Sequence, residues 1–150
     1  MLMEIHKAGK EDRDFILHAH KEILKSSGLI QSDLEENIDK DILDECEECK
    51  CLIVESDDKK VAMCLYSNIY WADSGNGIYL SQIYVEPEYR GKGIVQNLFA
   101  KVFEDEPDAN FITLLVGKEN ACMQKVMHNI NAKMHDLFTY EIRRECLIKE

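Results

Sequence analysis

The residues with the clearest chemical potential lie at positions 83–95, where the sequence reads IYVEPEYRGKGIV. An apolar stretch typical of a strand runs into a charged turn, two glycines follow, and a helical pattern begins behind them. Gly91 and Gly93 would leave backbone N–H groups bare at the start of a helix, while Arg90 and Lys92 add positive charge. This arrangement predicts a binding site for a phosphorylated small molecule.

The six cysteines are a second set of chemically active side chains. Cys46, Cys49 and Cys51 are spaced closely enough to hold a metal, but no second ligand pair with the spacing of a zinc site follows them. The simpler interpretation is that they belong to the end of a helix and the start of a strand. We therefore expect no metal, and we expect reduced thiols because the chain shows no export signal.

The composition narrows the classes of partner. The 150 residues include 18 basic and 29 acidic side chains, a formal net charge of −11. This argues against a nucleic-acid binder, which needs a basic face. It suits cationic partners such as amines or basic peptides, although an acidic surface also keeps many proteins in solution. No signal peptide and no bilayer-spanning run is seen, so we expect a cytoplasmic protein without membrane association, folded as a single domain over residues 1–150.

Hydrophobic periodicity predicts the elements that position these residues. In the N-terminal half we expect a helix at 11–25 with Gly28 as its C-cap, a second helix opened by a capping box at 32–35 with Leu34, Ile38 and Ile42 inward, strands at 51–55, 61–71 and 78–85, and a hairpin loop at 73–77. In the C-terminal half we expect a helix with an apolar stripe from Ile94 to Phe103, an apolar strand at 111–116 covered on both faces, a helix capped by Asn120, and a strand at 137–142. This order indicates an α/β protein.

The order of elements, with these residues, resembles the GNAT superfamily of N-acetyltransferases along essentially the whole chain. The most specific part is residues 90–95, where Arg90 and Gly93 match the family pattern and the preceding VEPEY is typical of it. Val95 departs from the pattern, which usually has Gly or Ala there. The resemblance implies a mixed, mostly antiparallel, V-shaped sheet whose two central strands splay apart, flanked by about four helices.

The resemblance also implies that acetyl-CoA lies between the strands at 78–85 and 111–116. The pantetheine arm would pair with backbone at Ile83, Tyr84 and Val85. The pyrophosphate would rest on the amides of Arg90, Gly91, Lys92, Gly93, Ile94 and Val95, with Asn120 and Met127 of the last helix also in the cofactor site. The branched side chain of Val95 either crowds the pyrophosphate or faces the core, and the sequence leaves both open.

The implied reaction is direct attack of a primary amine, on a small molecule or a peptide, on the thioester of acetyl-CoA. A backbone N–H near Val85 or Tyr84 would polarise the carbonyl. The tyrosine that usually protonates the thiolate stands seven residues after the asparagine that begins the last helix, and here that position is Met127. His128 is a candidate acid or a surface histidine, and Cys122 a candidate acid or a buried thiol.

The general base is also open. Ser81 and Gln82 occupy the positions where polyamine-acetylating relatives carry acids, and neither can serve. Glu86 is a candidate base or an exposed turn residue, with Asp73 in the hairpin as another choice. Tyr70 and Trp71 either line the acceptor site or pack at a strand end. A non-catalytic acyl-CoA-binding regulatory module is the alternative function, and relatives of this type lead us to expect a homodimer.

Overall fold

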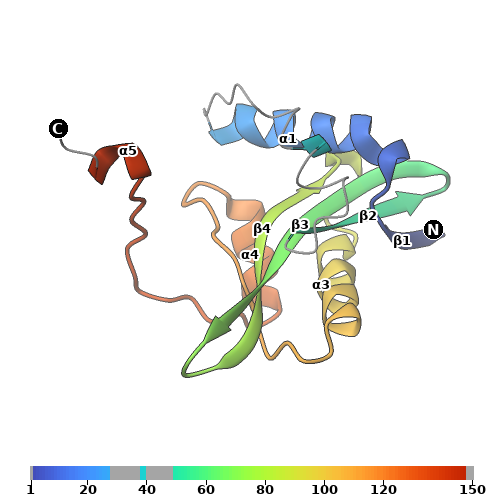
Figure 1. Ribbon diagram of the computed structural model, residues 1–150. Helices are drawn as coiled ribbons and strands as arrows, with labels where there is room; N and C mark the ends of the chain where they lie inside the picture. The colour runs from blue at the N-terminus through green and yellow to red at the C-terminus, as the bar shows by residue number, and fades with distance from the viewer. Residues whose placement is uncertain (1, 28–37, 40–48, 148–150) are drawn as a thin grey trace. The chain divides into compact units, whose positions relative to one another are not determined.

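The computed structural model describes residues 2–27, 38–39 and 49–147 (Figure 1). The chain divides into two compact units, Met1–Leu115 and Val116–Glu150, and each is described by itself. The predicted second helix, with its capping box at 32–35, and the C-cap Gly28 lie outside the described residues. The single domain over residues 1–150 stays a prediction.

The first unit contains a five-stranded mixed sheet with the order β1-β2-β3-β4-β5. Neighbouring strands from β1 to β4 are antiparallel, and β5 runs parallel to β4. The strands are β1 (Met3–Lys7), β2 (Lys50–Ser56), β3 (Lys59–Trp71), β4 (Gly75–Val85) and β5 (Ile112–Thr113). The predicted α/β fold class and the mixed, mostly antiparallel sheet are therefore confirmed.

The helices begin and end close to the positions expected from the sequence. They are the 3-10 turns η1 (Lys10–Asp12) and η3 (Pro87–Tyr89), and the helices α1 (Arg13–Ser27), α3 (Ile94–Asp105), α4 (Ala121–Asn129) and the one-turn α5 (Arg144–Leu147). Among the described residues three helices exceed two turns, slightly fewer than the four expected. None of the described helices has the length and apolar character needed to cross a membrane.

The core of the first unit lies on both faces of the sheet. Helix α1 covers one face, where its apolar stripe meets alternate strand residues (Figure 1). The cluster there consists of Ile16, Ala19, Ile38, Cys51, Ile53, Met63, Leu65 and Tyr84. Helix α3 follows the β4 end of the sheet and buries Ile94, Val95, Leu98, Phe99 and Val102. The prediction that Ile38 is inward is confirmed, since it is 1% exposed.

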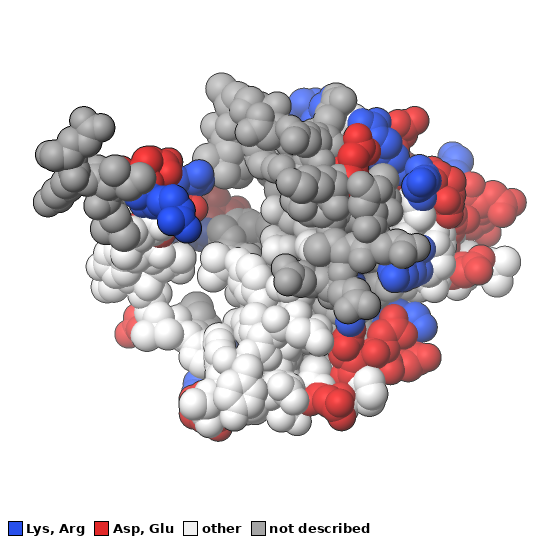
Figure 2. Space-filling view, in the orientation of Figure 1, with Lys and Arg blue, Asp and Glu red and all other residues white. Residues whose placement is uncertain are grey.

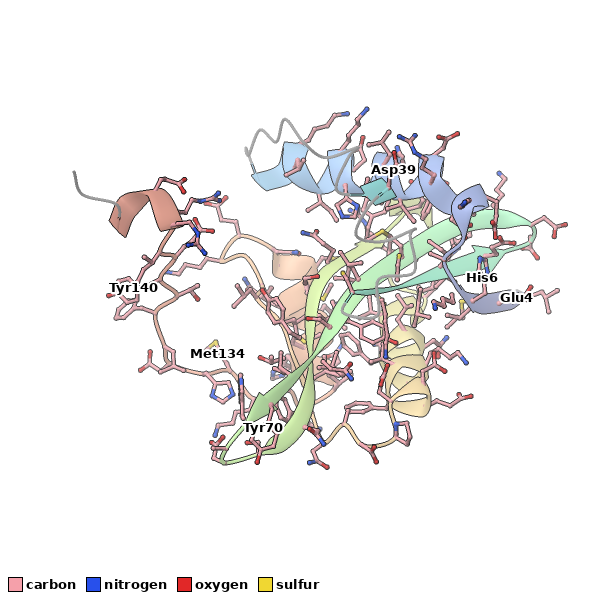
Figure 3. All side chains as sticks on the ribbon, viewed as in Figure 1. Glu4, His6, Asp39, Tyr70, Met134 and Tyr140 are labelled. Carbon is pink, nitrogen blue, oxygen red and sulfur yellow. The ribbon has the colours of Figure 1, made fainter. Side chains whose placement is uncertain are left out.

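Two predicted strands differ from the structure. The strand expected at 111–116 is reduced to the two residues of β5, and Leu115 is 66% exposed, so the expectation of cover on both faces was wrong. Residues 137–142 form no strand, and Phe138 there is 86% exposed. Tyr140 lies on the same segment (Figure 3). An apolar or alternating run becomes a strand only when a neighbouring strand supplies hydrogen bonds, which the local pattern does not reveal.

Charge is unevenly distributed along the first unit. Between Lys60 and Glu86 the chain carries one charged residue, Asp73, although 31% of all residues are charged. The face over the distal β3–β4 hairpin is accordingly almost uncharged, whereas acidic side chains gather around β1 and the β2–β3 turn (Figure 2). The hairpin is therefore a poor surface for a polycation.

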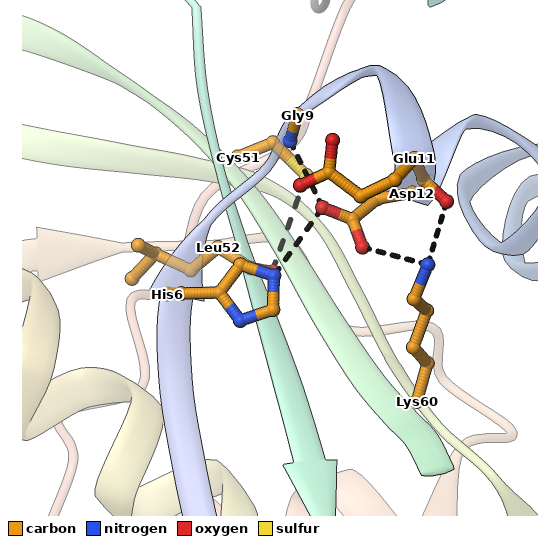
Figure 4. A network of polar contacts seen from close by, with 7 residues as sticks. All are labelled: His6, Gly9, Glu11, Asp12, Cys51, Leu52 and Lys60. Atoms are coloured by element: carbon orange, nitrogen blue, oxygen red, sulfur yellow. Dashed lines mark hydrogen bonds and ion pairs between the residues drawn. The ribbon is translucent and has the colours of Figure 1, made fainter. Parts of the chain in front are cut away.

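A buried carboxylate fixes the start of α1 against the sheet (Figure 4). Asp12 is fully buried, and its Oδ2 accepts a hydrogen bond of 2.9 Å from the Gly9 N–H. Lys60 of β3 places its Nζ 2.9 Å from Asp12 Oδ1, and His6 of β1 places its Nε2 3.3 Å from Oδ2. Burial acts to raise the pKa of Asp12, but the hydrogen bond from Gly9 and the contacts with Lys60 and His6 outweigh it and hold the pKa below its ordinary value of 3.8.

Asp12→Asn should lower the free energy of unfolding at neutral pH by about 3 kcal/mol, because it leaves Lys60 without its carboxylate partner. The depressed pKa means that this stabilisation is complete above the unfolded pKa of 3.8 and is lost as the pH falls through the folded pKa. Urea unfolding at neutral and acidic pH measures the difference in the free energy of unfolding between the wild type and the variant. This difference should become smaller in acid. A difference that stays constant with pH would contradict the assigned role.

Candidate functional site

The loop that follows β4 is held by backbone hydrogen bonds. The Glu86 N–H donates to the Val61 carbonyl at 2.8 Å and so ends the β3–β4 ladder. The Tyr89 N–H then returns to the Glu86 carbonyl at 2.9 Å, which closes the turn η3. Pro87 occupies the first position of η3, where its missing N–H costs nothing. The chain therefore enters the glycine segment along a fixed path.

Gly91 and Gly93 adopt the left-handed conformation, with φ of 75° and 81°. Gly93 is the N-cap of α3, and no side chain caps the first turn of that helix. A Cβ added to either glycine would meet no heavy atom within 4 Å. The two glycines thus satisfy the backbone and leave open space above N–H groups that a helix start does not satisfy internally. An anion fits this cradle, since the helix dipole also favours negative charge there.

Two cations flank the cradle in an otherwise acidic chain. Arg90 donates through Nε to the Val85 carbonyl at 2.9 Å, which anchors its guanidinium at the end of β4. Lys92 holds its Nζ 5.0 Å from the centre of the Tyr89 ring, within the range of a cation–π contact. Both residues are exposed. Positive charge is therefore fixed close to the open amides, as binding of a phosphate requires.

The outer edge of β4 is open beyond its first residues. Strands β4 and β5 pair only at Ile78 with Ile112 and at Tyr79 with Thr113, and then part. Backbone groups of a strand point alternately to its two neighbours. The Glu86 N–H bonds to the Val61 carbonyl, so the backbone groups of Tyr84, two residues earlier, also point to β3. Those of Ile83 and Val85 therefore face the open edge. The expected V-shaped opening is present in this unit.

A β-bulge changes the direction of β4 at the middle of this edge. Leu65 is paired with Gln82 and Tyr66 with Leu80, so Ser81 is the additional residue. The Ser81 hydroxyl donates to the Leu65 carbonyl at 3.1 Å. The Ser81 hydroxyl is therefore engaged in a hydrogen bond within the sheet.

Val95 faces the core, which decides between the two alternatives left by the sequence. It is 8% exposed and lies on the buried face of α3 with Ile94 and Leu98. Its side chain is therefore directed away from the open cradle that Gly91 and Gly93 form. The departure from the family pattern at this position does not obstruct the anion site.

Val95→Ala should lower the free energy of unfolding by about 2 kcal/mol, because it removes two buried methyl groups. Affinity for CoA, the ligand expected from the family resemblance, should change by less than about twofold. Val102→Ala, at the other end of the same helix and fully buried, is the matched control. Chemical unfolding and calorimetric titration measure the two effects. A large gain in CoA affinity for Val95→Ala alone would show that the valine does crowd the ligand.

Glu86 is not the exposed turn residue that one interpretation of the sequence expected. Its side chain is 23% exposed, and Oε1 lies 2.8 Å from His18 Nε2 of α1. The Tyr84 hydroxyl donates to Oε2 at 3.2 Å. Burial, followed by the neighbouring Glu86, raises the pKa of Tyr84 to about 12, so this phenol stays a neutral donor. Sequence reasoning did not single out His18, because its contact with Glu86 spans 68 residues and no local pattern marks it.

The hairpin aromatics play different structural parts. The rings of Trp71 and Phe111 lie 4.8 Å apart, and Phe111 also fills the space beside Gly77. Trp71 therefore packs at the strand end, as one of the two interpretations held. Tyr70 is 70% exposed and projects from the β3–β4 hairpin (Figure 3). Asp73 lies exposed in the turn.

The second unit holds the remaining candidates on α4. The Asn120 side chain accepts a hydrogen bond of 3.1 Å from the Met123 N–H, so the predicted N-cap is confirmed. Met127 is partly buried, whereas His128 and Cys122 are exposed. The interpretation of Cys122 as a buried thiol was wrong, because it occupies an outward position in the first turn. Whether Asn120 and Met127 contact a cofactor stays a prediction.

One group of potential metal ligands occurs among the residues that the structure describes. His6, Asp12 and Glu55 bring a ligand atom each to within 4.8 Å of one another. Lys60 already supplies a positive charge 2.9 Å from Asp12. A second cation would be repelled there, so the group is better explained as a structural ion pair. Cys51 lies in the α1-side core, and Cys46 is outside the described residues.

A mixed sheet with a parting strand pair, and an anion cradle between a strand and a helix, define an acetyltransferase-like α/β protein. The model of the acetyltransferase (GNAT) family matches residues 17–129, so the chain belongs to this family. A possible acetyltransferase from Clostridium difficile 630 is 27% identical, with a TM-score of 0.77 over 95% of this chain and 98% of that one. The structure of AAC(6')-Iy with the bisubstrate analogue CoA-S-monomethyl-acetylneamine, 17% identical, shares the fold, with a TM-score of 0.78 over 95% and 99% of the two chains.

A curated relative matches a shorter segment. Thialysine N-epsilon-acetyltransferase of Sus scrofa is 52% identical over 40 residues, which are 27% of this chain and 24% of that protein. The matched segment thus spans about a quarter of the length of the curated relative. A match of this extent does not assign the activity of that protein to this chain.

Proposed function

We propose that this protein is an N-acetyltransferase that transfers the acetyl group of acetyl-CoA to a primary amine of a small molecule or a peptide. The observation that carries the proposal is the cradle at Gly91 and Gly93, which lies directly beyond the open edge of β4. A long ligand with an anionic end and an amide-containing arm fits both features. The structure of AAC(6')-Iy with a CoA-containing analogue supports this assignment, because that protein shares the fold.

The geometry of the loop and of β4 supports a definite set of cofactor contacts in this proposal. The pantetheine amides pair with Ile83 and Val85, whose backbone groups face the open edge, rather than with Tyr84, whose backbone groups point to β3. The pyrophosphate accepts from N–H groups at the start of α3, with the charges of Arg90 and Lys92 beside it. Contacts of Asn120 and Met127 with the cofactor stay a prediction from the family resemblance.

In the reaction the amine nitrogen attacks the thioester carbon, a C–N bond forms and the C–S bond breaks. A backbone N–H of Ile83 or Val85 polarises the carbonyl oxygen. The amine gives up a proton to a base, and the CoA thiolate takes one up. A thiol like that of cysteine has a pKa near 8.5, so the thiolate leaves tolerably without an acid, whereas a lysine-like amine with a pKa near 10.4 must first lose a proton. An α-amine, with a pKa near 8, makes the smaller demand on the base and is the favoured acceptor class.

The alternative function, a non-catalytic acyl-CoA-binding module, is favoured by Met127 at the position of the usual tyrosine. Calorimetric titration with CoA and a thiol-release assay with acetyl-CoA and a broad panel of amines separate the two. Binding with amine-dependent release supports the enzyme. Binding without release across the panel supports the regulatory module, and absence of binding contradicts both. The homodimer and the cytoplasmic location stay predictions, the first of which light scattering checks.

A further inference from the structure

A polar cluster joins α1 to the end of β4, on the face of the sheet that α1 covers. His18, Tyr84 and Glu86, which we call the α1–β4 clamp, are held by two hydrogen bonds and by a ring contact. His18 Nε2 lies 2.8 Å from Glu86 Oε1, and the Tyr84 hydroxyl donates to Oε2 at 3.2 Å. The His18 ring meets the Tyr84 ring edge-on, with centroids 5.9 Å apart. Both carboxylate oxygens of Glu86 are thus engaged.

The position of Glu86 in the chain links the clamp to the loop that carries Gly91 and Gly93. The backbone of this residue ends the β3–β4 ladder through its N–H and begins η3 through its carbonyl. Four residues further on, Arg90 returns to the Val85 carbonyl. The side chain of Glu86 is the third attachment, and it ties the root of the loop to α1. A loop fixed in three directions loses less conformational freedom when it binds a ligand.

We propose that His18 is a positioning residue for the cofactor cradle, acting through Glu86. The inference rests on the proposed binding of acetyl-CoA to that cradle. The clamp places the carboxylate of Glu86 beside a site for anions, and electrostatic repulsion alone would make this residue unfavourable for binding. Its benefit must therefore come from the geometry that it imposes on residues 86–93.

The decisive variant is Glu86→Ala, tested by calorimetric titration with CoA. If charge alone mattered, removing a carboxylate near the pyrophosphate would tighten binding. We expect binding to weaken about fivefold instead, which is the scale of one partly exposed ion pair. His18→Leu should weaken binding to a similar extent, and His18→Gln, which keeps a donor, should restore part of the affinity. Glu22→Gln removes a carboxylate one helical turn away that is paired with Lys25, and it should leave CoA binding unchanged.

Hydrogen exchange of the unliganded protein provides a readout independent of CoA. Amides of residues 86–93 should exchange faster in Glu86→Ala and His18→Leu than in the wild type, while those of β2 stay protected. Unchanged or tighter CoA binding in Glu86→Ala, with wild-type binding intact, overturns the positioning role and leaves the proposed function standing. If the wild type binds no CoA, the proposed function fails and the positioning of a cofactor fails with it, while faster exchange would still support the clamp itself.

Discussion

Gly93→Asp should abolish CoA binding while the protein stays folded. At φ of 81° an aspartate is strained by about 1 kcal/mol, but its Cβ meets no heavy atom within 4 Å, so the fold can accept it. The side chain then fills the space that the pyrophosphate needs, and its charge repels the phosphates. Losing two charge-assisted hydrogen bonds costs about 3 kcal/mol, which corresponds to an affinity at least about 100-fold weaker.

The control for this variant is Gly75→Asp. Gly75 has a nearly identical φ of 80° and begins β4, so the substitution adds the same charge in a similarly strained backbone. Its Cβ would also lie 3.1 Å from the side-chain nitrogen of Asn110, which makes this control the more demanding of the two for the fold. Thermal unfolding should therefore shift both variants by a few degrees. Calorimetric titration should find CoA binding lost only in Gly93→Asp. Equal CoA affinities in the two variants would show that the cradle is not part of the cofactor site.

The cradle could be predicted from the sequence because its determinants are local. A strand pattern, a proline at the first position of a turn, two glycines and a helical stripe lie within a few residues of each other, and each restricts the backbone in one way. The orientation of Val95 was harder to predict, because the apolar stripe placed its side chain in the core whereas the family pattern placed a small residue beside the ligand. The helical periodicity was the better guide, since burial of a branched side chain outweighs a pattern shared by relatives.

What the sequence could not supply depends on contacts between distant residues. The contact of His18 with Glu86 joins residues far apart in the chain, and neither residue carries a local mark of the other. The strand expected at 137–142 shows the reverse case: the local pattern is that of a strand, but among the described residues no neighbouring strand pairs with it. Residues such as Leu137 have the apolar character of a strand but remain 81% exposed in the second unit. Pairing, which is a property of the fold, decides both cases.

Met127→Tyr should accelerate acetyl transfer by about tenfold or more when departure of the thiolate limits the rate, because a positioned general acid contributes roughly 10²–10⁴-fold. The Asn120 cap fixes the start of α4. Position 127, seven residues or about two helical turns further on, is where the family resemblance implies a tyrosine. Methionine there is partly buried, so a ring of similar length can occupy the site. The measurement is kcat/KM for CoA release with the best amine of the panel.

Met127→Phe is the matched control, since it introduces the same ring without the hydroxyl. A faster Met127→Tyr with an unchanged Met127→Phe assigns the gain to proton donation, and equal rates in the two variants would exclude an acid at this position. The pair also decides between the two functions proposed above. If the wild type binds CoA without turnover and Met127→Tyr gains turnover that Met127→Phe does not, the cofactor and acceptor sites are competent, and the missing hydroxyl is what separates this protein from an efficient enzyme. If neither variant gains turnover in a protein that binds CoA, the missing group is instead the general base. Both carboxylate oxygens of Glu86, the candidate base, are already engaged in hydrogen bonds.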